Sequence, residues 1–423
     1  MLFVVLVLLA LLGMPLFAVI ALGALAAFHE QGLNTTLVVM EFQRIGELPV
    51  LVALPLFTFA GVLLSHSRTP GRLVDLTHAL FGWMPGGLAI LGLALFALMT
   101  AFTGASGITV VALGSLMLPA LLQAGYPERF SLGLVTAGSS LGVLFAPSLP
   151  LILYAVVAQQ VAPGQGVRIE ELFLAGILPG LLMLLLLAGW AMFKRMGVPP
   201  LETERPPMGT SLKAAAWELP LPIVVLGGIY GGYLLVIEAA VVTAAWVIVT
   251  LVAVRRDIPW TKLPGIIAEA MVLVGAILVV LGVSMASTNI MIDTQVPQRL
   301  FEAVEPWISN KYMFLLMINV LLLIVGMILD IFAALVIMAP LIIPIALAFG
   351  VDPVHLGIIF LANLTIGYCT PPVGINLFLA SHRFDRDILV IYRSTLPFLG
   401  WLLIALLVIT WWPGLSLWLA GRS

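Results

Sequence analysis

The sequence contains few charged residues for its length, and this scarcity excludes an ordinary water-soluble fold. Only 9% of its 423 residues are Asp, Glu, Lys or Arg, and 62% are hydrophobic, whereas soluble domains carry about 25% charged residues. The one cysteine, Cys369, excludes an internal disulfide framework and any metal site built from several cysteines. A net charge of −2 without a basic stripe gives no indication of a nucleic-acid partner. The composition predicts a multi-pass protein whose main surroundings are the lipid bilayer.

The first 27 residues also lack Lys and Arg. A signal peptide needs a basic start and an apolar core of about 7–15 residues, and this segment has neither the charge nor the short length. We therefore interpret Met1–Ala27 as a first membrane helix, with a bend near Gly13-Met14-Pro15.

Apolar runs of about 20 residues can cross a bilayer. Two further segments, 130–160 and 355–381, are apolar but interrupted by Gly and Pro, and we expect them to enter the membrane and return as re-entrant helical hairpins. The expected fold is an all-α membrane protein with about 11–12 transmembrane helices plus two hairpins. The spanning runs lie near residues 1–27, 48–65, 78–102, 105–124, 172–193, 219–235, 237–254, 265–289, 312–329, 331–349 and 388–412.

A polar connector at 194–218 divides the chain into two halves, 1–193 and 219–423. It carries Lys194, Arg195, Arg205 and Lys213, and a second basic cluster follows at 255–262. Basic loops favour the cytoplasm. Two short spans between these clusters would return the chain to the same side, so both clusters are expected to be cytoplasmic and the acidic loop 290–311 to be outside.

Residues 29–48 mix polar and apolar side chains. Their pattern suits an amphipathic helix lying at the membrane interface. A solvated connecting loop explains the same composition, and the sequence leaves these two alternatives open.

The two interrupted segments resemble each other at a fixed offset. Gly142 and Gly367 are 225 residues apart, and the same offset relates Gly125 to Gly350 and Pro147 to Pro372. Unpaired backbone groups cost several kcal/mol each in lipid, so irregular backbone survives there only where protein buries it or where it lines a cavity. One such segment could be explained by helix packing, but a matched pair in two halves indicates a transporter binding site.

The residue types at these interruptions suit a cation beside an organic anion. Glycine and proline free backbone carbonyls, which together with hydroxyl oxygens are ligands for Na⁺, and helix N-termini attract carboxylates. The residues predicted to hold the cation are Ser106, Ser139, Ser140, Gly142, Asp330, Asn363, Thr365, Gly367 and Thr370. Those predicted to lie nearer the substrate are Pro147, Ser148, Gly374 and Asn376.

Two acidic residues have both a functional and a structural explanation. Asp330 stands between apolar runs, where an ionisable residue is functional by default. It could complete a cation site or cap the helix that follows it. Glu238 begins an apolar run, and an acidic residue in the first turn of a helix accounts for it.

No enzyme or ATP-driven pump is indicated. Gly104-Ala105-Ser106-Gly107 matches the short G-x-S-G pattern of rhomboid-like intramembrane proteases, but the five histidines stand at or near polar connectors and supply no evident base. Asp330 lacks the second embedded acid that an aspartyl protease needs, and the chain has no nucleotide-binding motif.

At these residues the chain resembles the large membrane subunit of TRAP (tripartite ATP-independent periplasmic) transporters over essentially its whole length. The resemblance implies Na⁺-coupled uptake of organic acids such as C4-dicarboxylates or sialic acid across a bacterial inner membrane. It also implies a small four-helix membrane subunit, a periplasmic substrate-binding protein and an elevator mechanism. The stretches that carry it are Ala53–Phe57, Ala60-Gly61, Gly86-Gly87, Thr103–Gly107, Gly138–Pro150, Leu329-Asp330, Gly350–Gly357 and Asn363–Asn376.

The chain departs from the family pattern in places. Ala146-Pro147-Ser148 replaces the usual Pro-Pro-Ser, and only Glu238 remains of a Thr-Pro-Thr-Glu stretch. These changes leave the number of cation sites open. Two other functions also remain: a Na⁺/dicarboxylate symporter that works alone, with similar hairpins, and a channel-like subunit without a coupled ion.

Overall fold

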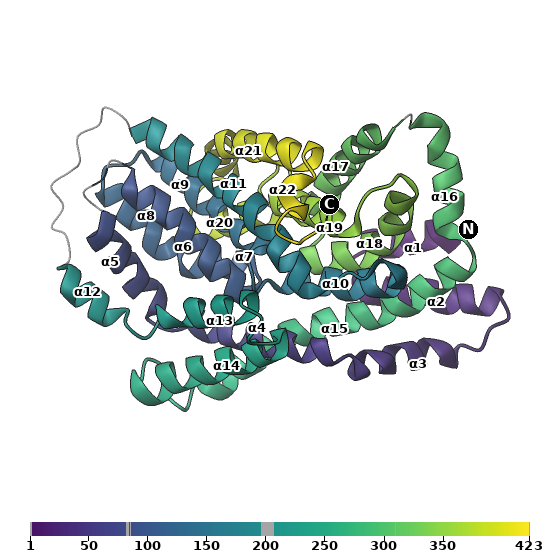
Figure 1. Cartoon of the computed structure of the whole chain (residues 1–423), viewed down its shortest axis with the longest axis horizontal. Helices are drawn as coiled ribbons and strands as arrows, with labels where there is room; N and C mark the ends of the chain where they lie inside the picture. The colour runs from purple at the N-terminus through teal and green to yellow at the C-terminus, as the bar shows by residue number, and fades with distance from the viewer. Residues whose placement is uncertain (1, 82–83, 85, 196–206, 309, 423) are drawn as a thin grey trace.

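The computed structural model describes residues 2–81, 84, 86–195, 207–308 and 310–422, and within these ranges the chain is helical without a strand (Figure 1). The helices of the first half are α1 (Leu2–Leu11), α2 (Leu16–Glu30), α3 (Thr36–Arg44), α4 (Ala53–Ser65), α5 (Thr69–Phe81), α6 (Gly87–Thr103), α7 (Ser106–Ala112), α8 (Gly114–Gln123), α9 (Glu128–Gly138), α10 (Leu149–Val161) and α11 (Ile169–Arg195). Those of the second half are α12 (Met208–Ala214), α13 (Pro220–Tyr230), α14 (Val236–Ile248), α15 (Leu263–Asp293), α16 (Val296–Val304), α17 (Lys311–Ile328), α18 (Ile331–Ala348), α19 (Pro353–Gly367), α20 (Ile375–Phe384), α21 (Ile388–Trp411) and α22 (Gly414–Leu417).

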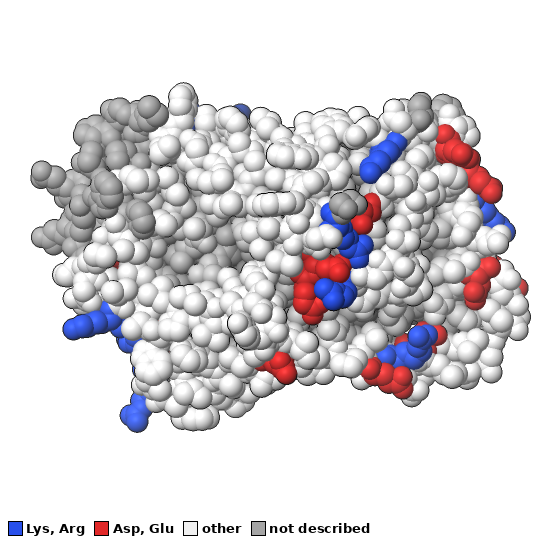
Figure 2. Space-filling view, in the orientation of Figure 1, with Lys and Arg blue, Asp and Glu red and all other residues white. Residues whose placement is uncertain are grey.

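Fewer helices can span a membrane alone than the sequence suggested. Among the described residues, six helices are long and apolar enough, or nine if each pair of helices joined at a sharp bend is one span. The expected 11–12 crossings are reached only if shorter apolar helices of 10–17 residues, such as Gly87–Thr103 and Pro353–Gly367, cross as well. The face drawn in Figure 2 has broad areas without a charged side chain, as a surface in contact with lipid requires.

The N-terminal segment is not one bent helix. It forms α1 and α2, which fold back on each other, so that a Cβ atom on Gly23 would lie 3.1 Å from Leu6 Cδ1. Gly13 takes a φ of +89° at the turn, a conformation that glycine adopts without strain. The expected bend at Gly13-Met14-Pro15 is thus a reversal of direction.

Of the two alternatives for residues 29–48, the structure supports the helix. Nine of its residues form α3, which packs along α15 and buries Val38, and the η1 turn (Ile45–Glu47) after it buries Ile45. Leu37, Met40 and Phe42 are exposed on α3. The alternative of a solvated loop is wrong for 36–44.

The two helical hairpins lie upstream of the segments that were expected to form them. In the first hairpin, α7 and α8 fold back antiparallel to α6. A Cβ atom on Gly92 of α6 would therefore lie 3.1 Å from Met117 Cε of α8. In the second, α17 runs out and α18 returns. There the rings of Phe314 and Phe349 stack with 4.7 Å between centroids, and Lys311 Nζ donates to the carbonyl of Gly350 at 3.1 Å.

The segments 130–160 and 355–381 are instead interrupted helices. In the first, α9 continues through the η3 turn (Leu141–Leu144) into α10, with a bend of 42°. Its two parts pack on different partners, α9 on α21 and α10 on α18. The second has the same plan, since α19 packs on α17 whereas α20 packs on α7. The prediction of re-entrant hairpins at these positions is therefore wrong, although both interruptions are present.

The repeat itself is confirmed by element boundaries. Helix α9 begins at Glu128 and α19 at Pro353, and α7 begins at Ser106 and α18 at Ile331, each pair 225 residues apart. Gly125 and Gly350, which precede α9 and α19, both take positive φ values of +78° and +71°.

Helix α11 shows that the two repeats are inverted. Near its start, Glu171 bonds Arg422, which also contacts Asp352 at the open end of the second hairpin. Near its end, the backbone of Met192 lies beside Gly86 at the open end of the first hairpin. The 27 residues of α11 extend about 40 Å, so the hairpins enter the molecule from opposite ends.

The helices form two groups that meet along α4 and α15. In the α15 group, α2, α3, α4 and α14 pack around or beside α15 (Figure 1). The hairpin group contains α6–α11 and α17–α22, which pack on one another. The two basic clusters lie together as expected, because Arg255 Nη2 donates to the carbonyl of Ala214 at 2.5 Å. Residues 196–206 of the expected connector, Arg205 included, lie outside the described residues.

Candidate functional site

The first interruption is held against the tip of the first hairpin. Thr100, in the last turn of α6, donates from its hydroxyl to the carbonyl of Ser139 at 2.6 Å, and its Oγ1 lies 3.0 Å from that of Thr109 on α7. The η3 turn lies directly on α6, since a Cβ on Gly142 would overlap the carbonyl oxygen of Ala97. Glycine is therefore required at position 142 by a close backbone approach.

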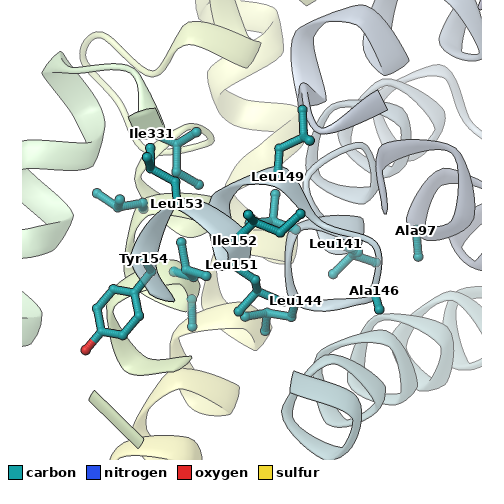
Figure 3. Packing of buried hydrophobic residues seen from close by; sticks show 14 of the residues in the cluster. Ala97, Leu141, Leu144, Ala146, Leu149, Leu151, Ile152, Leu153, Tyr154 and Ile331 are labelled. Carbon is teal, nitrogen blue, oxygen red and sulfur yellow. The ribbon is translucent and has the colours of Figure 1, made fainter. Parts of the chain in front are cut away.

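Apolar packing fixes the start of α10, directly after the first interruption. Figure 3 shows the side chains from Leu141 to Tyr154 packed together, with Ile331 of the second hairpin beside Leu153. Leu149 through Tyr154 are fully buried. This packing joins the first repeat to the second at the point where α18 begins.

The second interruption is held in the same way by the second hairpin. The backbone N–H of Gly374 donates to the carbonyl of Met327 at 3.1 Å, and the N–H of Ile331 donates to the hydroxyl of Tyr368. Gly367 lies against Gly326, where an added Cβ would be 2.7 Å from the Gly326 backbone. Each hairpin tip is thus held against the interruption of its own repeat.

Asn376 connects the two repeats at the centre of the site. Its Nδ2 donates to Ser140 Oγ at 2.7 Å and to Ser139 Oγ at 3.3 Å, and its Oδ1 accepts from Ser106 Oγ at 3.0 Å. Cys369 is buried beside them, with its sulfur 3.6 Å from Ser140 Oγ. The structure thus brings together four of the predicted residues, which we call the Asn376 cluster: Ser106, Ser139, Ser140 and Asn376.

A cavity of about 980 Å³ opens beside this cluster, between the hairpin group and the α15 group. The starts of α7, α18 and α20 form what we call its floor, at Ser106, Ile331 and Ile375. Helix N-termini present the positive end of the helix dipole, which favours an anion. At α18 the first N–H groups already bond Tyr368 and Asp330. Glu269, Leu273 and Ile277 of α15 line the side that belongs to the other helix group.

Apart from Asp330, which precedes Ile331 on the floor, the charged groups stand at what we call the rim of the cavity. Arg383 is the one Arg or Lys among the described lining residues, and its Nε donates to Ser115 Oγ at 2.7 Å. It lies eight residues after Ile375 on α20, or about 12 Å along the helix. His66 at the end of α4 faces Glu269 of α15, with 2.9 Å between Nε2 and Oε2. A ligand the size of a C4 acid on the floor would therefore be separated from these side chains.

Several predicted residues lie outside the cluster and the cavity. Pro147, Ser148 and Gly374 are buried in the interruptions and do not line the cavity, so the structure gives no support to their predicted contact with a substrate in it. Thr370 donates to the carbonyl of Ile366 at 2.9 Å within its own helix turn.

Asn363 belongs to a second polar group. Its Nδ2 donates to Asn319 Oδ1 on α17 at 2.7 Å, and Asn319 donates in turn to Thr410 on α21 at 2.9 Å. Within the described part of the chain, the Oδ1 of Asn363 and the hydroxyl of Thr365 are buried without a hydrogen-bond partner. Buried polar atoms are normally satisfied, so these two oxygens, like that of Ser148, are free to accept a cation.

Asp330 does cap a helix, as one of its two explanations required. Its Oδ1 accepts from the N–H groups of Phe332 and Ala333 at 3.0 and 3.1 Å, and its side chain also lines the cavity. Glu238 likewise caps α14 by accepting from the N–H of Leu235 at 2.9 Å, which supports its structural explanation.

An Asp330→Asn substitution distinguishes the helix-capping role of Asp330 from the role of its negative charge. Asparagine caps helices as well as aspartate, so the melting temperature should not change. If the chain takes up a solute with Na⁺, as its sequence predicts, the Na⁺ concentration for half-maximal uptake should rise about tenfold, because the fixed negative charge would no longer attract the cation. Thermal unfolding and Na⁺ titration of uptake measure the two effects. An unchanged Na⁺ requirement would leave Asp330 with the cap alone.

The donors gathered at the two interruptions are oxygen atoms, which suit hard cations. Within the described ranges, no group of three or more His, Cys, Asp or Glu side chains could hold a metal ion. Hydroxyl, amide and backbone oxygens therefore remain as ligands, and these suit cations such as Na⁺ better than transition metals.

The sequence argument missed the cavity residues that come from distant segments. Arg383, Ser115, His66 and Glu269 line one space but come from α20, α8, α4 and α15. Arg383 lies in the last turn of α20, just past the interrupted segment. Basic residues are common in the last turn of a helix, so the sequence around Arg383 did not indicate a functional role for it.

The chain was compared with known proteins. Residues 1–415 match the family model described as tripartite ATP-independent periplasmic transporter, DctM component. The chain is 35% identical over 97% of its length to the isethionate TRAP transporter permease protein DctMQ of Oleidesulfovibrio alaskensis, of which it covers 64%. It is 33% identical to the C4-dicarboxylate TRAP transporter large permease protein DctM of Rhodobacter capsulatus, with 87% of this chain and 86% of that protein covered.

One further relative and one solved structure are also similar to this chain. The ectoine TRAP transporter large permease protein TeaC of Halomonas elongata is 30% identical, with 97% of this chain and 96% of that protein covered. Among solved structures, the YdaH transporter of Alcanivorax borkumensis matches with a TM-score of 0.60 and 18% identity, over 90% of this chain and 88% of that chain. At this identity the likeness concerns the fold alone.

Proposed function

The chain belongs to the DctM family of TRAP transporter large permeases, and from this premise we propose that it imports a small organic acid together with Na⁺. A permease of this family is not an enzyme, and it works with a small membrane subunit and a periplasmic binding protein. The observation that carries the proposal is the Asn376 cluster, which joins both interruptions beside the floor of the cavity.

The cation is a co-transported substrate in this proposal. The hydroxyl and amide oxygens of Ser106, Ser139, Ser140 and Asn376 lie within hydrogen-bond distance of one another and would form one position. The buried oxygens of Asn363 and Thr365, on different faces of α19, would each be available to contribute to a second. Because each hairpin tip holds the interruption of its own repeat, a cation bound there would stabilise the closed contact between them.

The anion would lie on the floor, among the starts of α7, α18 and α20. Relatives are named for isethionate, C4-dicarboxylates and ectoine, each of which has a carboxylate or sulfonate group. We infer that this acid group meets the helix N-termini, where bound cations would offset the charge of Asp330. Arg383 at the rim would draw anions into the cavity by long-range attraction.

The division into two helix groups supports an elevator movement. The hairpin group carries both interruptions and the floor of the cavity, whereas the α15 group supplies Glu269 and its neighbours on α15. Sliding one group along the other would carry the bound substrate. Lys194, Arg129, Arg386 and Arg393 gather at one end of α11, which favours the cytoplasm of a bacterial inner membrane for that end.

Uptake into proteoliposomes tests the proposal directly. The chain and its small membrane subunit would be reconstituted, with the binding protein and a labelled C4-dicarboxylate or isethionate outside. We expect uptake only with an inward Na⁺ gradient and only with the binding protein. A K⁺ gradient of equal size and a binding protein from an unrelated system serve as controls.

The other functions give different results in the same assay. Uptake with Na⁺ but without the binding protein would identify a symporter that works alone. Flux that needs neither would identify a channel-like subunit, and the coupled mechanism would be rejected.

A further inference from the structure

A second cavity, of about 330 Å³, lies on the hairpin group away from the transport cavity. It is formed where the turn between α8 and α9 meets the end of α11 and the first half of α21. Three cationic side chains line it, Arg129, Lys194 and Arg393, and the described residues that line it include no Asp or Glu. Among the described residues, no ion pair involves Arg129 or Arg393, whereas nearby Glu128 is paired with Arg386 at 2.7 Å.

The inner wall of this basic pocket carries an unused hydrogen-bond donor. Trp190 lines the pocket, and its buried indole nitrogen has no hydrogen-bond partner among the described residues. Buried donors are normally paired, so this N–H indicates a missing acceptor. Lys194 lies over the same indole ring, with Nζ 4.7 Å from the centroid, which positions its charge beside that donor.

Apolar surface continues from the pocket toward the middle of the membrane. Phe130, Pro397 and Phe398 line the pocket itself, and Trp401 lies 6.1 Å from Trp190. Leu185 on α11 and Leu396 on α21 are exposed on the two helices that form its sides. A ligand that fits must therefore combine an anionic head with an apolar tail.

We propose that this pocket binds the headgroup of an anionic phospholipid, with the phosphate between Arg129, Lys194 and Arg393 and an acyl chain along α11 and α21. Basic pockets between transmembrane helices at the cytoplasmic side hold such headgroups. The phosphate accepts from Trp190 Nε1 and from the three cations, and the acyl chain covers apolar surface that faces lipid.

Native mass spectrometry of the chain with its small subunit tests this site. The complex in detergent would be titrated with phosphatidylglycerol and, separately, with zwitterionic phosphatidylcholine. We expect one tightly held phosphatidylglycerol per chain. Its affinity should fall roughly 100-fold in the triple variant Arg129→Gln/Lys194→Gln/Arg393→Gln, because each cation near an anionic lipid contributes about five- to tenfold.

A control variant removes the same charge elsewhere. Arg68→Gln/Arg256→Gln/Lys262→Gln lowers the net charge equally but leaves the basic pocket intact, so it should retain the lipid. Trp190→Phe should weaken binding several-fold while keeping the aromatic wall. Size-exclusion chromatography confirms that each variant is folded.

Three results would overturn the proposal. Equal retention of phosphatidylglycerol by the triple variant would place the lipid elsewhere. Equal binding of phosphatidylcholine would remove the role of the anionic head. Displacement of the lipid by soluble glycerol 3-phosphate at a similar concentration would show that the pocket takes a free phosphate compound instead.

Discussion

A Gly367→Val protein is expected to reach the membrane and to lose Na⁺-driven uptake. Gly367 ends α19 against Gly326 of α17, and even a Cβ would lie 2.7 Å from the Gly326 backbone. Both contacting groups are backbone, so neither can rotate away, and the tip of the second hairpin must move off the interruption. A displacement of about 1 Å at a site can cost on the order of 100-fold in rate, and we expect at least that loss of uptake.

Initial uptake rates in proteoliposomes, corrected for the amount of reconstituted protein, measure this effect. Gly400→Val on α21 is the matched control, since a Cβ at Gly400 meets nothing within 4 Å and uptake should stay near that of the unmodified protein. If Gly367→Val fails to fold, Gly367→Ala gives the smaller form of the same clash. Normal uptake by folded Gly367→Ala and Gly367→Val proteins would contradict the assignment of this contact to transport.

An Asn376→Ala substitution should have an effect of similar size for a different reason. It removes two bonds from the Asn376 amide to Ser139 and Ser140 and the bond from Ser106. Each hydrogen bond contributes about 0.5–1.5 kcal/mol to stability, so the protein should remain folded with a lowered melting temperature. We expect uptake to fall about 100-fold because the two interruptions are no longer held together.

The Na⁺ dependence of the remaining uptake distinguishes this role from substrate contact. If Asn376 helps to hold one of two cations, its loss should lower the Hill coefficient for Na⁺ and raise the half-saturating Na⁺ concentration. If Asn376 touches only the substrate, the substrate KM alone should rise and the Na⁺ curve should not change. Asn34→Ala, in an exposed turn, is the control for the same substitution away from the site.

Sequence alone predicted the repeat but could not predict which segments reverse direction. The offset of 225 residues and the close approach at Gly142 and Gly367 follow from glycine and proline positions, which have few alternatives in lipid. Whether an interrupted helix bends or turns back depends on its packing partners. Here α9 and α10 pack on α21 and α18, which keeps the two parts of the interrupted helix apart.

The sequence did not predict the positions of the two hairpins, because only two residues separate the arms of each hairpin. Leu329-Asp330 separates α17 from α18, and Gly104-Ala105 separates α6 from α7. Such tips leave long apolar runs nearly unbroken, so each arm has the composition of a separate span. The cavity was also beyond sequence reasoning, because Arg383 and Glu269 meet there only through the packing of the two helix groups.

The inverted repeat has a consequence for the energetics of a full cycle. The two hairpins enter from opposite ends of α11, so exchanging the conformations of the two repeats would give the same architecture opened to the opposite face. Two states related in this way share their internal contacts and should differ little in free energy. A permease with such an inverted repeat has no preferred direction of transport. The direction of net flux must therefore be set by the ion gradient and by the partner that delivers the solute. Loaded with solute inside and placed in a reversed gradient, the same protein should run as an exporter.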